Sequence, residues 1–150
     1  MKYSLILLLF VFSQIHAQIG NENLSQGLTE QELTKAKEDY KQMMKTETWV
    51  NNHKLTKDFA NKTNAVLLKS PTPPKDRESL IQLLEQNLGQ TQFKSISEAK
   101  DYIAKMDESE AKMKAENKEL FEMMSRATQT QRREIAKPFF ELSMKERGLR

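Results

Sequence analysis

Methionine is the residue whose abundance and placement in this sequence first suggest a chemistry. The chain contains eight methionines, and two tandem pairs, Met43-Met44 and Met123-Met124, lie in well-separated segments. Thioether sulfur is a ligand for copper(I), while the flexible methionine side chain also fills irregular cores and suits adaptable binding surfaces. We interpret the methionines as core residues first, as the lining of an apolar groove second, and as a copper site last.

Aromatic residues extend the predicted groove. The tandem Phe139-Phe140 places two rings on different faces of a helix, so one is expected in the core and the other on the surface near Arg132, Arg133 and Lys137. The residues that we predict to line a groove for a partner or ligand are Met43, Met44, Trp49, Met123, Met124, Phe139 and Phe140.

Residues that support catalysis or metal binding are scarce. The sequence has no cysteine and only two histidines, which excludes a zinc site built from several His or Cys ligands. A Ser–His–acid triad in the mature chain would have to use His53. The acidic run Asp107-Glu108-Ser109-Glu110 lacks the turn glycine of a calcium loop. We therefore predict no catalytic residue, no metal site and no cofactor, and keep a carboxylate-based hydrolase as the enzymatic alternative.

The first seventeen residues have the pattern of a cleavable secretion signal. Lys2 precedes an apolar run, Leu5–Phe12, and the small residue Ala17 stands before Gln18. The run is too short for a membrane span, which needs about 20 apolar residues. We predict a signal peptide over 1–17, cleavage between Ala17 and Gln18, and a secreted or periplasmic product.

Charge and composition limit the classes of partner. The formal net charge is +3, which does not favour nucleic-acid binding, because such proteins usually carry a clustered basic face. The segment from Arg126 to Arg150 is the most basic one, and contact of this C-terminal helix with a membrane surface is an alternative to a solvated face. Asn23 and Asn61 begin N-glycosylation sequons, which would matter only in a eukaryotic secretory pathway; bacterial and eukaryotic sources both stay open.

The elements that must position these residues are predicted to be helices. Capping-box patterns at Thr29 and Ser95, an N-cap at Asp76 and apolar residues at helical spacing mark their starts and faces. Asn51-Asn52-His53 is predicted to be a turn, and Gly89 a left-handed C-cap. Pro138 predicts a kink or a restart of the last helix. The residues of that helix expected to face inward are Ile135, Phe139, Leu142 and Met144. The predicted helices are 29–50, 54–69, 76–88, 96–126 and 130–147, and the middle of 96–126 is expected to project into solvent.

The predicted fold is all-α: an irregular bundle of about five helices after the signal peptide. A flexible leader over 18–28 precedes a single domain over 29–150, in which a helical hairpin (29–70) is joined by a proline linker (71–74) to the helices of 75–150. We predict a non-enzymatic protein that binds a protein partner through the apolar groove. A carrier of a small hydrophobic ligand is the alternative, and self-association stays open.

Overall fold

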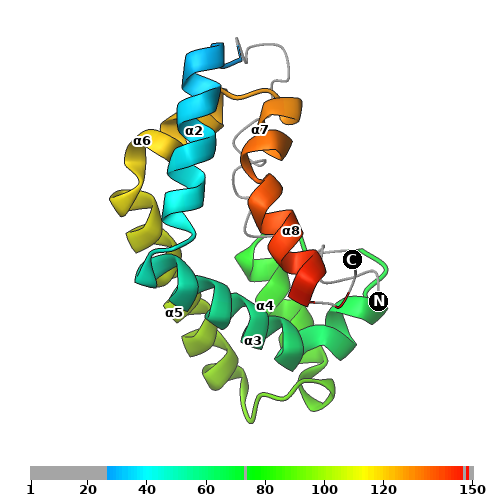
Figure 1. Cartoon of the computed structure of the whole chain (residues 1–150). Coiled ribbons are helices and arrows are strands. Elements are labelled where there is room, and N and C mark those ends of the chain that lie inside the picture. The colour runs from blue at the N-terminus through cyan, green and yellow to red at the C-terminus, as the bar shows by residue number, and fades with distance from the viewer. Residues whose placement is uncertain (1–26, 73, 147, 149–150) are drawn as a thin grey trace. The chain divides into compact units, whose positions relative to one another are not determined.

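The computed structural model describes residues 27–72, 74–146 and 148, and this part of the chain is built from helices (Figure 1). The all-α prediction is confirmed, and no strand occurs among the described residues. The predicted signal peptide and the cleavage site at Ala17 and Gln18 lie outside the described residues. About five helices were predicted, whereas the described residues form seven α-helices and one 3-10 helix: α2 (Glu30–Met43), α3 (Glu47–Lys69), α4 (Arg77–Gln86), η1 (Leu88–Gln90), α5 (Ile96–Glu116), α6 (Lys118–Arg126), α7 (Gln129–Ile135) and α8 (Lys137–Glu146).

Helix starts agree with the capping signals in the sequence. Thr29 and Glu32 form the predicted capping box of α2, and Asp76 caps α4 by accepting from the backbone N–H of Ser79 at 2.8 Å. Ser95 accepts from the backbone N–H of Glu98 at 3.1 Å at the start of α5. These local hydrogen bonds satisfy backbone N–H groups that have no partner inside the helix. Because each bond joins residues close in sequence, the helix starts can be predicted from the residue pattern alone.

The predicted turn at Asn51-Asn52-His53 is wrong, because these residues lie inside α3. The chain breaks earlier, after Met43. Thr46 is the residue that restarts it: its hydroxyl accepts from the backbone N–H of Trp49 at 3.2 Å and donates to the carbonyl of Met43 at 2.7 Å. Asn52 is buried, so tertiary packing offsets the weak helix propensity of asparagine.

The predicted long helix over 96–126 is two helices, α5 and α6. Asn117 separates them with φ −124° and ψ 35°, and its side-chain amide donates to the carbonyl of Met113 at 2.8 Å. The expectation that the middle of this region projects into solvent is also wrong. Met106, Glu110 and Met113 are buried and recur at the spacing of one helical face, so this stretch packs inward.

Pro138 restarts the last helix, as predicted. Helix α7 ends at Ile135 and α8 begins at Lys137, with Ala136 between them at φ −81° and ψ 0°. Proline has no backbone N–H to donate to the preceding turn, and the second position of a new helix does not need one. Gly89, by contrast, is not a left-handed cap: it lies in the 3-10 helix η1, and the cap residue of α4 is Asn87.

The described chain forms two compact units that do not coincide with the predicted halves. Unit 1 contains Asn51–Ala111, and unit 2 contains the described residues up to Val50 together with those from Lys112 onward. The predicted proline linker 71–74 therefore lies within unit 1, between α3 and α4. Helices α3 and α5 each contribute residues to both units.

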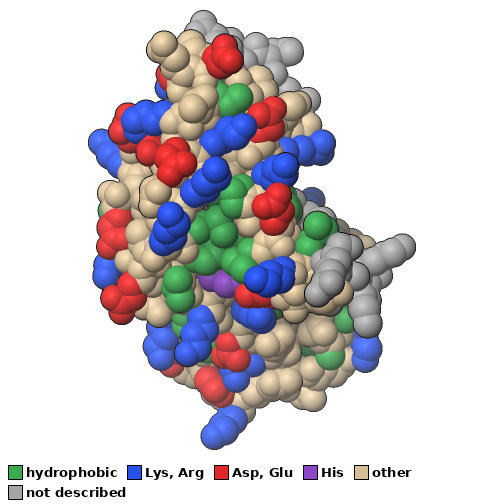
Figure 2. All heavy atoms as spheres, viewed as in Figure 1, with side chains coloured by type: hydrophobic (Ala, Val, Ile, Leu, Met, Phe, Trp, Pro, Cys, Tyr) green, Lys and Arg blue, Asp and Glu red, His purple; other side chains and the backbone are tan. Residues whose placement is uncertain are grey.

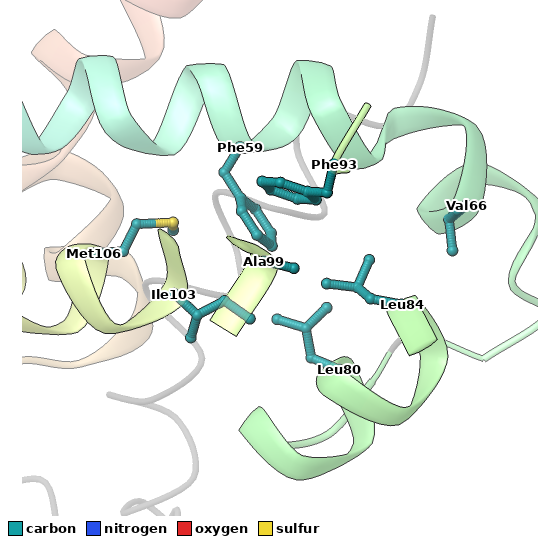
Figure 3. Close-up of a cluster of buried hydrophobic side chains, with 8 residues drawn as sticks. All are labelled: Phe59, Val66, Leu80, Leu84, Phe93, Ala99, Ile103 and Met106. Atoms are coloured by element: carbon teal, nitrogen blue, oxygen red, sulfur yellow. The ribbon is translucent and has the colours of Figure 1, made fainter. Parts of the chain in front are cut away.

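Unit 1 is organised around a cluster of apolar side chains from α3, α4, α5 and the segment before α5 (Figure 3). Leu80 and Leu84 of α4 point toward Ile103 of α5 in this view, and Leu84 is fully buried. Three rings, those of Phe59, Phe93 and Tyr102, lie with centroids 5.8–6.0 Å apart. Such clustered aromatic contacts add to the burial of apolar area and give this unit a packed centre without disulfides.

The hydroxyl of Tyr102 ties this ring cluster to α3 by donating to Asp58 at 2.6 Å. Burial, together with the hydrogen bond to the Asp58 carboxylate, raises the pKa of the Tyr102 hydroxyl above its ordinary value. Lys62 lies 3.8 Å from the same carboxylate and 5.9 Å from the centroid of the Phe93 ring. These groups are arranged as a structural link between two helices of unit 1.

Candidate functional site

All seven residues of the predicted groove belong to unit 2, and most of them are buried there. Met43, Trp49, Met123, Met124 and Phe139 have exposed fractions of 2–9 %. Met44 is half-buried, and Phe140 is exposed with a fraction of 43 %. The structure therefore uses five of the seven side chains to fill the interior, so they do not form an open groove on unit 2.

The packing of helices in unit 2 explains why these side chains are inside. Helix α2 packs against α6 and α7, and α7 packs against α8, as their positions in Figure 1 show. Tyr40 and Ala36 from α2 are almost fully buried, as is Ile135 from α7. Burial raises the pKa of the Tyr40 hydroxyl above its ordinary value, because the charged form is poorly solvated in the interior. The methionines adapt their shape to the spaces between these rigid residues.

The first turn of α3 and the first turn of α8 meet through an aromatic pair. The rings of Trp49 and Phe139 lie 6.3 Å apart at 74°, an edge-to-face arrangement that aromatic quadrupoles favour. Phe139 also lies 6.0 Å from the ring of its neighbour Phe140. The prediction that one ring of the tandem is buried and the other exposed is confirmed.

The outward face of α8 carries the exposed apolar residues of unit 2's C-terminal part. Phe140 and Met144 are four residues apart, so they lie on the same side of the helix, and their exposed fractions are 43 % and 49 %. The expectation that Met144 faces inward is wrong, because Phe139 and Ser143 form the buried side of α8. We call Phe140 and Met144 the α8 patch.

Lysines stand at both ends of the α8 patch. Lys137 and Lys145 are exposed, and Arg133 is exposed on the preceding helix. Lys137 lies 3.8 Å from Glu141, with 73 % and 62 % of their side-chain surfaces exposed, and such a surface pair contributes little to stability. On the face drawn in Figure 2, side chains of both signs are mixed. Around the α8 patch, Arg133, Lys137 and Lys145 outnumber the exposed Glu141 and Glu146 by one.

Three charged side chains of α2 form ion pairs with residues of α6 and α7 at the surface of unit 2. Lys35 lies 3.0 Å from Glu119, and Lys37 lies 3.5 Å from Glu134. Glu32 accepts from Arg126 at 2.7 Å. The backbone N–H of Thr29, the Arg126 guanidinium and the Thr29 hydroxyl together lower the pKa of Glu32 to about 2, so this carboxylate stays charged in mild acid.

The chain before α2 is held by the side-chain amide of Gln131. This amide accepts from the backbone N–H of Leu28 at 2.9 Å and donates to its carbonyl at 2.8 Å. Gly27 precedes this contact with φ +73°, and a Cβ at that position would come within 3.3 Å of a methyl group of Thr128. A residue other than glycine is therefore strained here. Gln131 also completes the capping box of α7 with Thr128.

A separate pocket of about 340 Å³ lies in unit 1, between the proline segment and α4. Its lining residues are Ser70, Thr72, Pro74, Lys75, Asp76, Ser79, Gln82, Leu83 and Gln86. None of the predicted groove residues lines this pocket. The side chains of Asp76 and Ser79 each hydrogen-bond to the other's backbone as the capping box of α4. The Asp76 carboxylate therefore stabilises the N-terminus of this helix.

The residues weighed for catalysis lie on α3 and α5 within unit 1. His53 is half-buried on α3, and Glu110 is buried on α5, whereas Asp107 pairs with Arg77. Over the described ranges, no three His, Asp or Glu side chains are grouped so as to hold a metal ion. None of the helices in these ranges has both the length and the apolar character that a membrane span requires.

Met144 is the site residue that sequence reasoning misplaced. The signal that could have found it is its spacing of four from Phe140, which was already expected on the surface. Helical geometry puts both on one side, and placing Phe139 inside forces both outside.

The chain was compared with family models, curated proteins and solved structures, and none of them matches it.

Proposed function

We propose that this chain is exported through a cleaved signal peptide over 1–17 and works as a non-enzymatic helical protein that binds a protein partner through the α8 patch. The observation that carries the proposal is the exposed pair Phe140 and Met144, one helical turn apart on the outer side of α8. Apolar anchors at this spacing are the means by which one helix contacts an apolar face on another protein.

Charge favours an acidic partner segment. Arg133, Lys137 and Lys145 outnumber Glu141 and Glu146 beside the patch, and a helix with acidic residues beside its apolar face would place carboxylates near the two lysines. An antiparallel pairing of two copies of α8 would instead bring the lysines of one copy near those of the other, which is unfavourable. We therefore propose a helical segment of a different protein, acidic and amphipathic, as the occupant.

The affinity expected from this surface is modest. Two half-exposed side chains form only the centre of an interface, because a stable complex usually covers about 800 Å² on each partner. Central aromatic anchors nevertheless contribute more than their share of the binding free energy, frequently above about 1 kcal/mol each. Phe140 is therefore the side chain whose replacement is expected to weaken binding most.

A pair of synthetic peptides tests the proposal on the purified mature protein. One is an amphipathic helix with leucines on one face and glutamates beside them; the other has lysines in place of the glutamates. Titration calorimetry is expected to show binding of the acidic peptide that weakens with added salt, and binding of the basic peptide at least about tenfold weaker.

Matched variants locate the site. Phe140→Asp is expected to weaken binding of the acidic peptide by about tenfold or more. Leu68→Asp changes another exposed apolar residue, with an exposed fraction of 36 % on α3, and is expected to leave binding unchanged. The proposal would be contradicted if the protein bound both peptides with equal affinity, or if Phe140→Asp bound the acidic peptide as tightly as wild type. Binding to anionic lipid vesicles without binding to the acidic peptide would also contradict it.

A further inference from the structure

Exposure separates the seven methionines of the described residues into three groups with different access to solvent. Five of them, Met43, Met106, Met113, Met123 and Met124, have exposed fractions of 2–7 %. Met44 is half-buried between α2 and α3. Met144 has an exposed fraction of 49 % and lies in the α8 patch beside Phe140. Met144 is the most exposed methionine among the described residues.

We propose that Met144 is a site of oxidation to methionine sulfoxide by peroxides. In this reaction a lone pair of the thioether sulfur attacks one oxygen of hydrogen peroxide, the O–O bond breaks, and an S–O bond forms while water leaves. The sulfur loses two electrons and the peroxide gains them. Methionine sulfoxide can be reduced enzymatically, so the modification is reversible in a cell with the appropriate reductase.

The modification changes the α8 patch because it turns an apolar side chain into a polar one. This consequence rests on the proposed function, in which Met144 and Phe140 contact the partner together. With a sulfoxide in place of the thioether, the apolar part of the patch is reduced to Phe140. Buried methionines remain thioethers under the same conditions, so the core of unit 2 is preserved while the surface is altered.

Oxidation mapping tests the site directly. The folded mature protein is treated with limiting hydrogen peroxide, and each methionine is followed by peptide mass spectrometry. Met144 is expected to oxidise at least about tenfold faster than the five buried methionines, the protection that a local opening free energy of about 1.4 kcal/mol provides. The difference is expected to vanish in denaturant. Oxidation of any buried methionine as fast as Met144 in the folded protein would overturn the proposal.

Binding of the acidic peptide tests the consequence separately. Peroxide treatment is expected to weaken binding to wild-type protein and to Met44→Leu, and to leave binding to Met144→Leu unchanged. If wild-type protein oxidises at Met144 but never binds the peptide, the proposed function fails and the modification site stands. If Met144→Leu loses binding on oxidation as wild type does, Met144 is not the residue through which peroxide acts on the patch.

Discussion

The carboxylate of Glu32 accepts from the backbone N–H of Thr29 at 2.9 Å and from Arg126 at 2.7 Å. One group therefore both caps α2 and joins it to the end of α6. The first of these contacts was predictable from the Thr29-x-x-Glu32 pattern. The second was not, because the pair is separated by 94 positions and nothing local to either residue indicates it.

We predict that Glu32 makes the protein sensitive to strong acid. Its folded-state pKa of about 2 lies below the ordinary 4.5, so the stabilisation is fully present above about pH 4.5 and is lost as the pH falls toward 2. In Glu32→Gln the capping box can persist but the charge is absent. The pH dependence of urea unfolding in this window is expected to be smaller for Glu32→Gln than for wild type.

Glu38→Gln is the matched control on the same helix, since Glu38 is exposed and accepts from the Gln42 amide at 2.7 Å within α2. It is expected to follow the wild-type pH profile. Identical profiles for wild type and Glu32→Gln would show that Glu32 has no such role in the folded protein.

Helix α3 contains a segment for which the local residue pattern predicts the wrong structure. The Asn51-Asn52-His53 segment has weak helix formers and resembles a turn, yet α3 runs through it because Asn52 is packed inside. The restart at Pro138 was predictable, since the missing N–H acts locally whatever the surroundings. The break at Asn117, where the side-chain amide donates to the carbonyl of Met113, was missed because the apolar spacing and charge pairs of 96–126 are typical of one continuous helix.

A proline scan distinguishes the continuous helix from a turn. Asn51 is exposed in the interior of α3, so Asn51→Pro removes a helical hydrogen bond without deleting a core side chain. We expect a loss of about 3 kcal/mol in unfolding free energy, measured by urea titration of the circular dichroism signal.

Glu47→Pro is the control for that substitution, because Glu47 is the first residue of α3 and proline is well accepted at that position. Its effect is expected to stay below about 1 kcal/mol. Equal and small effects of the two prolines would show that α3 does not continue through Asn51.

For the molecule as a whole, composition and periodicity were sufficient to predict an all-helical chain without disulfides, but not its division into units. The proline segment looked like the natural boundary, yet α3 and α4 on either side of it share the Phe59 and Leu84 cluster. The sequence did favour the core for the methionines, and Met123 and Met124 are buried. It did not reveal which helices cover them, because the packing of α2 against α6 and α7 joins segments that are far apart in the chain.

Processing of the precursor is the prediction at this scale. Expressed with its native start and exported, the protein is expected to lose 1–17 and to begin at Gln18, because the small Ala17 suits the peptidase pocket. Intact-mass measurement of the exported product checks this, allowing for cyclisation of the terminal glutamine. Ala17→Phe is expected to block or move the cut. A product that keeps Met1 in the exported fraction would refute the assignment.

The pairing of Leu28 with the Gln131 amide spans 103 positions of the chain. Synthesis proceeds from the N-terminus, so Leu28 is made long before the residue that secures it. Closing so wide a loop costs entropy that only later contacts repay. The contact between Leu28 and Gln131 is therefore expected to be among the last in unit 2 to form, after α7 has been synthesised and has packed.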